Sequence, residues 1–220
     1  ATTEIYTLSL HDALPIYVTG SGTVLNTLQP RPGDTIAVFG TGAVGLAAMM
    51  AGKISGCIKV IGIDIVDSRL ALAKELGATD VINSKNVDVV EEVKKLTGGL
   101  GVNWAVDTTG ITKVMEDSIK VLTQGGTTAT IAVTPNHIDL DTWNDLCVDD
   151  KKIVGVNMGD SIPQIDIPRL IEFYKAGMID FDKTEKFFNF DEINEANAAS
   201  RSGEVIKPVL IIDPDYVPGK

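Results

Sequence analysis

The chain has 220 residues, of which 44% are apolar and 22% are charged, as expected for a globular protein with one full α/β domain and a smaller additional part. Its formal net charge of −11 disfavours nucleic acids and anionic membranes as partners. The two cysteines, Cys57 and Cys147, give neither a disulfide framework nor the paired spacing of a structural zinc site. No apolar run reaches the ~18 residues of a membrane-spanning helix, and we recognise no signal peptide, so a cytoplasmic location is expected.

The first segment, Ala1–Ile16, reads ATTEIYTLSLHDALPI and has the period of neither a strand nor a helix. Back-translated, all sixteen residues fit one reading frame of a common short-read sequencing adapter. We therefore interpret Ala1–Ile16 as an adapter-derived artefact that should be left out of reasoning about the fold. The alternative is a natural N-terminal segment. On the first interpretation the natural sequence begins near Tyr17.

From Tyr17 onward, short apolar runs alternate with helical patterns. The end of a helix is expected over residues 23–28, before the breaking sequence QPRPGD. Several of the predicted strands are apolar throughout, which is typical of a parallel sheet buried on both faces. The predicted strands span residues 35–39, 59–63, 81–82, 102–106, 127–133 and 153–156, and the predicted helices span 44–54, 68–76, 87–96, 114–122 and 140–148.

After residue 158 the pattern changes. Helices are expected over residues 162–176 and 190–200, followed by a strand over 205–212 in which Pro208 indicates an edge or bulge position. The fold class that results is α/β, a doubly wound parallel (Rossmann) sheet with a C-terminal addition. We place the Rossmann domain at residues 17–158 and the additional helices and strand at 159–220.

The motif with the clearest chemistry is GTGAVG at Gly40–Gly45. A lone GxGxxG is a weak signal, but this one follows a predicted strand and opens a predicted helix. Gly40 would allow the tight turn, Gly42 would let the backbone approach a pyrophosphate, and Gly45 would let helix and strand pack closely. The helix N-terminus adds free amides and a positive dipole end. The sequence therefore predicts a dinucleotide site.

The same motif predicts an acidic residue about 20 positions further on, at the end of the second strand. Asp64 occupies that place in VIGIDIVDSR. Its carboxylate could accept hydrogen bonds from both adenosine ribose hydroxyls and would repel a 2′-phosphate, so NAD is favoured over NADP. Arg69 could weaken that preference by pairing with such a phosphate.

Other candidates carry less information. His137 is a lone loop histidine, for which a surface position is the ordinary expectation. Asp107 follows the fourth strand, where ligand contacts gather in open α/β sheets, but a polar turn before the next helix explains it equally well. Trp104 and Trp143 are expected in the core. No Ser/His/Asp or Cys/His arrangement can be defended.

The segments GDTIAVFGTGAVG, VIGIDIVDSRLALAKELGATDVIN and GEVIKPVLII resemble the medium-chain, zinc-type alcohol dehydrogenases. DSIPQIDIPRLIEFYKAG and DKTEKFFNFDEINEA look most similar to the aryl-alcohol (benzyl-alcohol) branch. The resemblance covers about Thr19–Ile212. Its motifs are highly specific for the superfamily and less so for the branch.

The resemblance also implies a cofactor site, residue by residue. The residues that match the family's motifs are Gly40, Gly42, Ala43, Val44 and Gly45 at the pyrophosphate, Asp64 and Arg69 at the adenosine ribose, Ile131, Ala132, Val133, Asn157 and Met158 beside the nicotinamide carboxamide, Lys207 toward the pyrophosphate, and Thr19 against the nicotinamide.

The sequence departs from the family where the catalytic zinc is held. In the family, an N-terminal GroES-like catalytic domain carries the zinc ligands, a proton-relay hydroxyl and four structural-zinc cysteines, and none of these has a counterpart here. The last catalytic zinc ligand falls at Pro15, inside the adapter-like segment. We therefore expect no catalytic and no metal-binding residues in this chain, and a tail from residue 159 that would return to the absent domain.

For the full-length parent, the resemblance implies hydride transfer between a primary alcohol and NAD, with zinc as the Lewis acid. An aromatic alcohol such as benzyl alcohol is the preferred substrate, and a polyol or an aliphatic alcohol is the alternative. The parent is expected to be a homo-oligomer with a subunit contact near residues 127–133 or their neighbours. For the chain as written, a non-catalytic NAD-binding module is the expectation.

Overall fold

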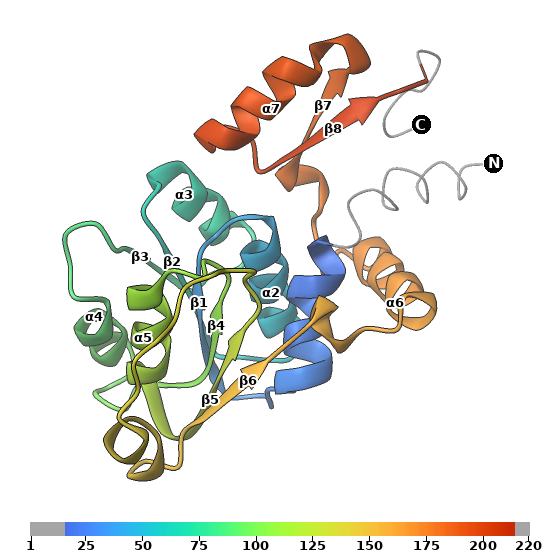
Figure 1. Ribbon diagram of the computed structural model, residues 1–220. Helices are drawn as coiled ribbons and strands as arrows, with labels where there is room; N and C mark the ends of the chain where they lie inside the picture. The colour runs from blue at the N-terminus through green and yellow to red at the C-terminus, as the bar shows by residue number, and fades with distance from the viewer. Residues whose placement is uncertain (1–15, 214–220) are drawn as a thin grey trace.

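The computed structural model describes residues 16–213, so nearly all of the adapter-like segment Ala1–Ile16 lies outside the described residues. Six parallel strands form one sheet in the order β3-β2-β1-β4-β5-β6, drawn in Figure 1. This order is that of the doubly wound Rossmann sheet, so the predicted fold class is confirmed. The strands are β1 (Thr35–Phe39), β2 (Lys59–Asp64), β3 (Asp80–Asn83), β4 (Val102–Asp107), β5 (Leu122–Thr130) and β6 (Lys152–Gly155).

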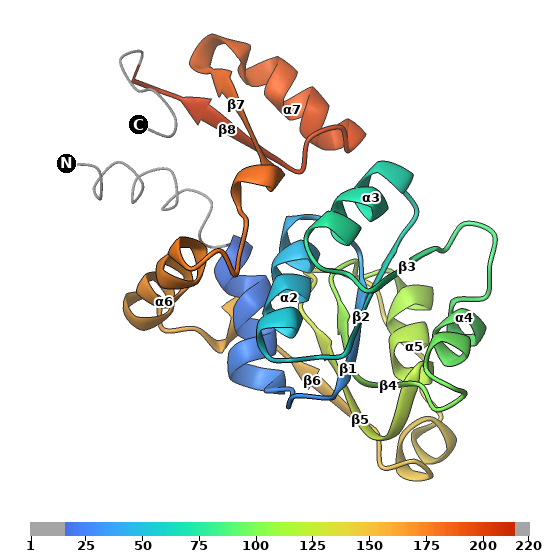
Figure 2. The same ribbon diagram turned by 180° about the vertical axis from the view of Figure 1, so that it is seen from behind.

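Helices cover both faces of the sheet, as Figures 1 and 2 show from opposite sides. One face packs against α2 (Ala43–Ile54), α3 (Asp67–Glu75) and a helix that is described from residue 16 and continues as the π-helix η1 (Thr23–Leu28). The other face packs against α4 (Val89–Leu96) and α5 (Thr112–Lys120).

Strand β1 shows why the sheet needs cover on both sides. Successive side chains of a strand point to opposite faces, and here Ile36 and Val38 lie in one buried cluster while Ala37 and Phe39 lie in the other. Each fully buried aliphatic side chain contributes on the order of 1.5–3 kcal/mol. A strand whose residues are all apolar, without alternation, is therefore expected where both faces of the sheet are covered.

The chain beyond β6 forms a smaller layer of its own. A two-stranded parallel sheet pairs β7 (Glu185–Asn189) with β8 (Lys207–Ile211), and α7 (Ile193–Ser202) joins them. Pro208 lies in β8, whose partner among residues 16–213 is β7 alone, so the predicted edge position is confirmed. The remaining elements are η2 (Thr142–Cys147), η3 (Met158–Asp160), α6 (Pro163–Lys175), η4 (Asp182–Thr184) and η5 (Phe190–Glu192).

Two expectations from the sequence are wrong, and one strand was missed. The strand predicted over residues 127–133 runs from Leu122 to Thr130, so residues 131–133 leave the sheet. Strand β7 was not predicted at all. Trp143, expected in the core, is 67% exposed on η2, because this segment is a single π-helical turn that contributes no buried residue. Within residues 16–213, no helix combines the length and apolarity needed to cross a membrane.

The junction between the helix at residue 16 and the small layer contains a cluster of ionisable groups. Glu185 faces Lys207 across the β7–β8 pair. The pKa of Glu185 is raised from 4.5 to about 7, chiefly by burial and also by the negative charge of Asp182, while Lys207 opposes the shift. Burial likewise raises the pKa of Tyr17, whose hydroxyl hydrogen-bonds with Thr184.

This cluster predicts how stability should depend on pH. Because the folded protein holds a proton on Glu185 that the unfolded chain loses near pH 4.5, the free energy of unfolding should fall as the pH rises from 4.5 to about 7. Glu185→Gln removes this titration and should stabilise the protein by about 1 kcal/mol at pH 8, since solvent partly screens the carboxyl. At pH 4 the gain should disappear.

Urea unfolding at both pH values measures the effect. Glu195→Gln, on the exposed side of α7, is the matched control for loss of one negative charge. A gain that is equal at pH 4 and pH 8 would contradict the assignment of this titration to Glu185.

Candidate functional site

The carboxyl ends of the parallel strands meet at one edge of the sheet, and a pocket of about 570 Å³ opens there. Its walls include residues at the carboxyl ends of β1, β2 and β4, among them Gly40, Asp64 and Thr108. The strand order reverses between β1 and β4, and ligands of open α/β sheets bind in the crevice at such a reversal. The pocket therefore lies where the topology predicts a ligand.

The glycine turn between β1 and α2 is shaped by close approaches at two of its three glycines. Gly40 has φ of +88°, and a Cβ there would lie 2.3 Å from Thr108 Oγ1. At Gly45 a Cβ would lie 1.8 Å from the Gly40 carbonyl oxygen. At Gly42, however, nothing lies within 4 Å of the Cβ position. The backbone at Gly42 is thus open toward the pocket that it lines, as the approach of a pyrophosphate requires.

Helix α2 begins directly at this turn. Its N-cap, Gly42, offers no side-chain acceptor, and the first amides of an α-helix have no partner inside the helix. Ala43 and Val44 supply two of those amides, and the positive end of the helix dipole adds to their attraction for an anion. Phosphate oxygens are acceptors of the charge and size that such a helix end binds.

Asp64 ends β2 beside the glycine turn and is 8% exposed. Its Oδ2 accepts from the Thr41 amide at 2.7 Å and from Thr41 Oγ1 at 3.0 Å. Its Oδ1 accepts from the amides of Ile65 at 2.7 Å and Val66 at 3.0 Å. The carboxylate lines the pocket and at the same time ties the glycine turn to the start of α3.

Arg69, in the first turn of α3, lines the same pocket. Its Nε is buried without a hydrogen-bond partner in the described part of the chain. The guanidinium group packs against Gly203 at the end of α7, where an added Cβ would lie 2.7 Å from one of its nitrogens. A guanidinium group whose Nε has no partner among residues 16–213 and that lines a pocket suits a ligand with oxygen acceptors.

The rim of the pocket has an apolar character that the motif analysis did not predict. Ile65, Val87 and Ile111 line it and are 54%, 44% and 55% exposed. Exposed branched side chains around one cavity suit the flat faces of an aromatic base. The only sequence signal was their place, directly after strand ends or before a helix, and that signal is weak.

Asp107 stabilises the polar turn after β4, which is the second of the two interpretations of this residue given above. Its Oδ1 accepts from the amide and hydroxyl of Thr109, at 2.9 and 2.7 Å, and its Oδ2 accepts from the Gly110 amide at 3.1 Å. It is fully buried, so it shapes the turn after β4. The two threonines beside it, Thr108 and Thr109, reach the pocket.

The residues that the resemblance assigns to the nicotinamide lie apart from this pocket. Thr19 donates through Oγ1 to Met158 Sδ at 3.9 Å, so two residues 139 positions apart meet. Gly22 and Gly159 make this meeting possible, because a Cβ on Gly22 would lie 2.5 Å from the Gly159 carbonyl oxygen.

The remaining residues that the resemblance assigns to the nicotinamide, and Lys207, which it assigns to the pyrophosphate, lie at three separate places. Residues 131–133 follow the end of β5, with Val133 fully exposed, and Asn157 follows β6. Lys207 lies in β8, opposite Glu185. None of these residues, and neither Thr19 nor Met158, lines the pocket.

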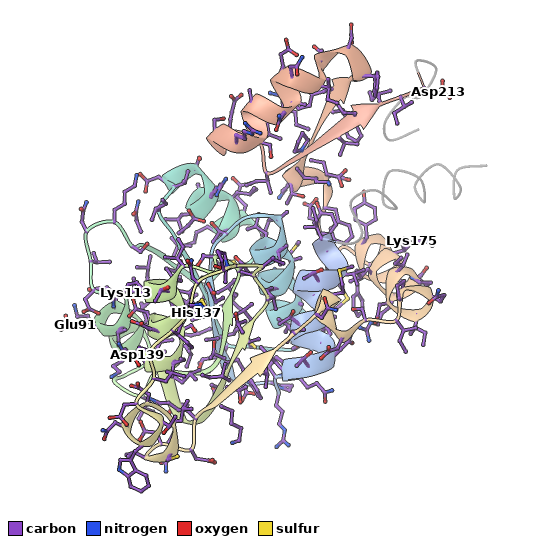
Figure 3. All side chains as sticks on the ribbon, in the orientation of Figure 1. Glu91, Lys113, His137, Asp139, Lys175 and Asp213 are labelled. Atoms are coloured by element: carbon purple, nitrogen blue, oxygen red, sulfur yellow. The ribbon has the colours of Figure 1, made fainter. Side chains whose placement is uncertain are left out.

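His137 is exposed on the loop after β5, as expected for a surface histidine. Its carbonyl oxygen accepts from Thr112 Oγ1 at 3.0 Å, which places it beside α5, as Figure 3 shows. Within residues 16–213, no group of three or more His, Cys, Asp or Glu side chains is arranged to hold a metal ion.

Comparison with known proteins gives a consistent result. A family described as zinc-binding dehydrogenase matches residues 43–176. Geraniol dehydrogenase of Castellaniella defragrans is 35% identical, over 94% of this chain and 58% of that protein. Alcohol dehydrogenase 1 of Pisum sativum is 33% identical, over 87% of this chain and 51% of that protein. The chain therefore spans about half the length of these relatives.

Solved structures agree with the sequence relatives. Benzyl alcohol dehydrogenase from Acinetobacter calcoaceticus superposes with a TM-score of 0.87 at 40% identity, over 90% of this chain and 54% of that one. A zinc-binding alcohol dehydrogenase domain protein from Burkholderia ambifaria gives a TM-score of 0.84 at 42% identity, over 90% of this chain and 53% of that one.

Proposed function

The chain belongs to the zinc-binding dehydrogenase family, and on that premise we propose that it is the NAD-binding portion of an alcohol dehydrogenase. The observation that carries this proposal is the open backbone at Gly42, which lies in one pocket with Asp64 and with Arg69. Pyrophosphate would bind at Gly42 and the first amides of α2, the ribose at Asp64 and Arg69, and adenine between Ile65, Val87 and Ile111. When bound, NAD supplies the hydride acceptor.

The choice between NAD and NADP rests on two side chains of opposite charge. Asp64 disfavours a 2′-phosphate by repulsion and by occupying the place beside the ribose. Arg69 would attract that phosphate, but its Nε is buried and one side of its guanidinium group is closed by Gly203. We therefore favour NAD.

For the nicotinamide half of the cofactor, the proposal rests on Thr19 and Met158, which the fold brings together, and on the backbone of residues 131–133 and Asn157. Lys207 is proposed to face the pyrophosphate from the small layer. That layer lies near the carboxyl edge of the sheet, since Gly203 contacts Arg69.

For the substrate we propose a primary aromatic alcohol, oxidised to the aldehyde. The supporting observation is the 40% identity to a benzyl alcohol dehydrogenase. The 35% identity to a geraniol dehydrogenase supports the second candidate, an aliphatic alcohol. Zinc, the Lewis acid of this chemistry, is proposed for the longer parent, and so is a homo-oligomeric state.

The 220-residue polypeptide itself should bind cofactor without turning over alcohol. Bound NADH should stabilise the fold by about RT ln(1 + [L]/Kd), or ~2.7 kcal/mol at a hundredfold excess over Kd. Hydride transfer also requires the alcohol to be held against the nicotinamide, and residues 16–213 contain no cluster of ligands for zinc.

A thermal shift with NADH, elemental analysis for zinc, and an NADH-formation assay with benzyl alcohol and with geraniol test this proposal. We expect a rise in Tm, no stoichiometric zinc and no turnover. No thermal shift at millimolar NADH would refute the cofactor assignment. Zinc-dependent turnover would refute the proposal that this polypeptide only binds cofactor.

A further inference from the structure

The carboxylate of Asp64 is fully occupied within the chain. A carboxylate offers about four acceptor positions, and four donors fill them: the amides of Thr41, Ile65 and Val66, and the hydroxyl of Thr41. Yet Asp64 lines the pocket, where the proposed function requires it to accept hydrogen bonds from a ribose. One of the four donors must therefore leave or share its position when a ribose binds.

Three of these donors are held by the backbone. The amides of Ile65 and Val66 lie in the turn into α3, and the Thr41 amide lies in the glycine turn, where the neighbouring Gly40 amide donates to the Ile63 carbonyl at 2.8 Å. Moving any of them would disturb β1, β2 or a helix start. The Thr41 hydroxyl differs, because rotation about a single side-chain torsion releases it.

We propose that the Thr41 hydroxyl takes the position on Asp64 Oδ2 that a hydroxyl of the adenosine ribose takes when the dinucleotide binds. Thr41 is then a positioning residue. It keeps the carboxylate satisfied and oriented in the empty pocket, and it competes with the vicinal diol of an adenine nucleotide. This inference rests on the proposed function.

The proposed competition predicts that removal of the Thr41 hydroxyl strengthens NADH binding. Thr41 is fully buried and its methyl group lies 3.3 Å from the Cβ position of Gly62, so valine fits the site while removing only the hydroxyl. Without that competitor, Oδ2 is open to the ribose. Since one hydrogen bond contributes about 0.5–1.5 kcal/mol, Thr41→Val should bind NADH roughly two- to twelvefold more tightly.

The test compares Kd values for NADH, AMP and 2′,3′-dideoxy-AMP by calorimetry. We expect Thr41→Val and Thr41→Ala to tighten NADH and AMP but not the dideoxy nucleotide, and Thr41→Ser, which keeps the hydroxyl, to lack the gain. The control is Thr128→Val. It removes another buried hydroxyl, that of Thr128 in β5, which donates to the Ser118 hydroxyl in α5 at 2.9 Å. It should leave all three Kd values unchanged.

Several results would overturn the inference. Unchanged or weaker AMP binding by both hydroxyl-free variants would mean that Thr41 supports the site rather than competing with its ligand. An equal gain for the dideoxy nucleotide would mean that the effect is not on the ribose hydroxyls. If the unsubstituted protein binds neither NADH nor AMP, the proposed function itself fails, and the inference fails with it.

Discussion

Gly45→Ala should cost the protein about 3–5 kcal/mol of its free energy of unfolding, a large share of the roughly 5–15 kcal/mol that is typical of a folded protein. The reason is the 1.8 Å that would separate the new Cβ from the Gly40 carbonyl oxygen. The Gly40 oxygen is a backbone atom and the position of the new Cβ is fixed by the backbone of residue 45, so no side-chain rotation can relieve the overlap. The helix α2 would have to move away from β1, and its buried residues Leu46 and Met49 would lose their packing.

Gly42→Ala is the matched substitution, three positions before Gly45 in the same motif. Nothing lies within 4 Å of its Cβ position, and its φ of −74° and ψ of −174° suit any residue. Stability should therefore stay within ~0.5 kcal/mol. The methyl group would, however, point into the space proposed for the pyrophosphate, and NADH should bind at least about tenfold more weakly, the equivalent of ~1.4 kcal/mol.

Urea unfolding and NADH titration on both variants separate the two glycine roles. If Gly45→Ala proved as stable as the unsubstituted protein, the close approach at the turn would have to be looser than the structure shows. If Gly42→Ala bound NADH normally, the pyrophosphate would have to lie elsewhere.

Asp64→Gly, with Arg69 retained, should weaken NADH binding roughly ten- to a hundredfold and should narrow or reverse the preference over NADPH. A hydrogen bond to a charged group contributes about 1.5–3 kcal/mol, and removing the carboxylate also removes the repulsion of a 2′-phosphate. The structure adds a second effect, because four internal donors lose their acceptor. Asp64→Asn tests that effect. Its amide oxygen can still accept from one pair of these donors, but its amide nitrogen cannot accept from the other pair.

Fluorescence titration with NADH and NADPH measures both changes. Asp67→Asn is the control, because it removes the same charge three residues further on, at an exposed position where Asp67 accepts from Asn83 at 2.6 Å. Equal loss for both cofactors would indicate collapse of the glycine turn rather than a changed ribose contact. Unchanged NADH affinity would mean that Asp64 does not face the ribose.

Much of the sheet could be predicted from local signals. Strands β1 and β2 are apolar runs bounded by glycine and proline, and their observed limits differ from the predicted ones by at most one residue. The start of β5 was misplaced because Gly125 and Gly126 look like a turn, whereas the strand passes through them. Strand β7 has no clear apolar alternation, and its partner β8 begins 18 positions after it ends.

Some residues of the candidate site could likewise be predicted from the sequence, and others could not. Gly40, Gly42, Gly45 and Asp64 could be identified because a motif fixes their spacing. The role of Thr41 could not, since it stands at a variable position of that motif and its hydroxyl matters only through contact with Asp64. The apolar rim has no local signature at all, because its members are ordinary aliphatic residues that the topology gathers around one cavity.

The π-helix η1 changes the direction in which the residues before it point around the helix axis. The Gln29 amide donates to the Val24 carbonyl five residues earlier, so this turn holds one residue more than an α-helical turn. Asn26 and Thr27, within η1, anchor it to Gly159 and Asp160, while Thr19 lies before it in the chain. Losing one residue within η1 would restore an α-helix and swing everything before it by about 100° around the helix axis, turning Thr19 away from Met158. Among related chains, insertions and deletions in this helix would therefore change the direction of a side chain and not merely the length of a segment.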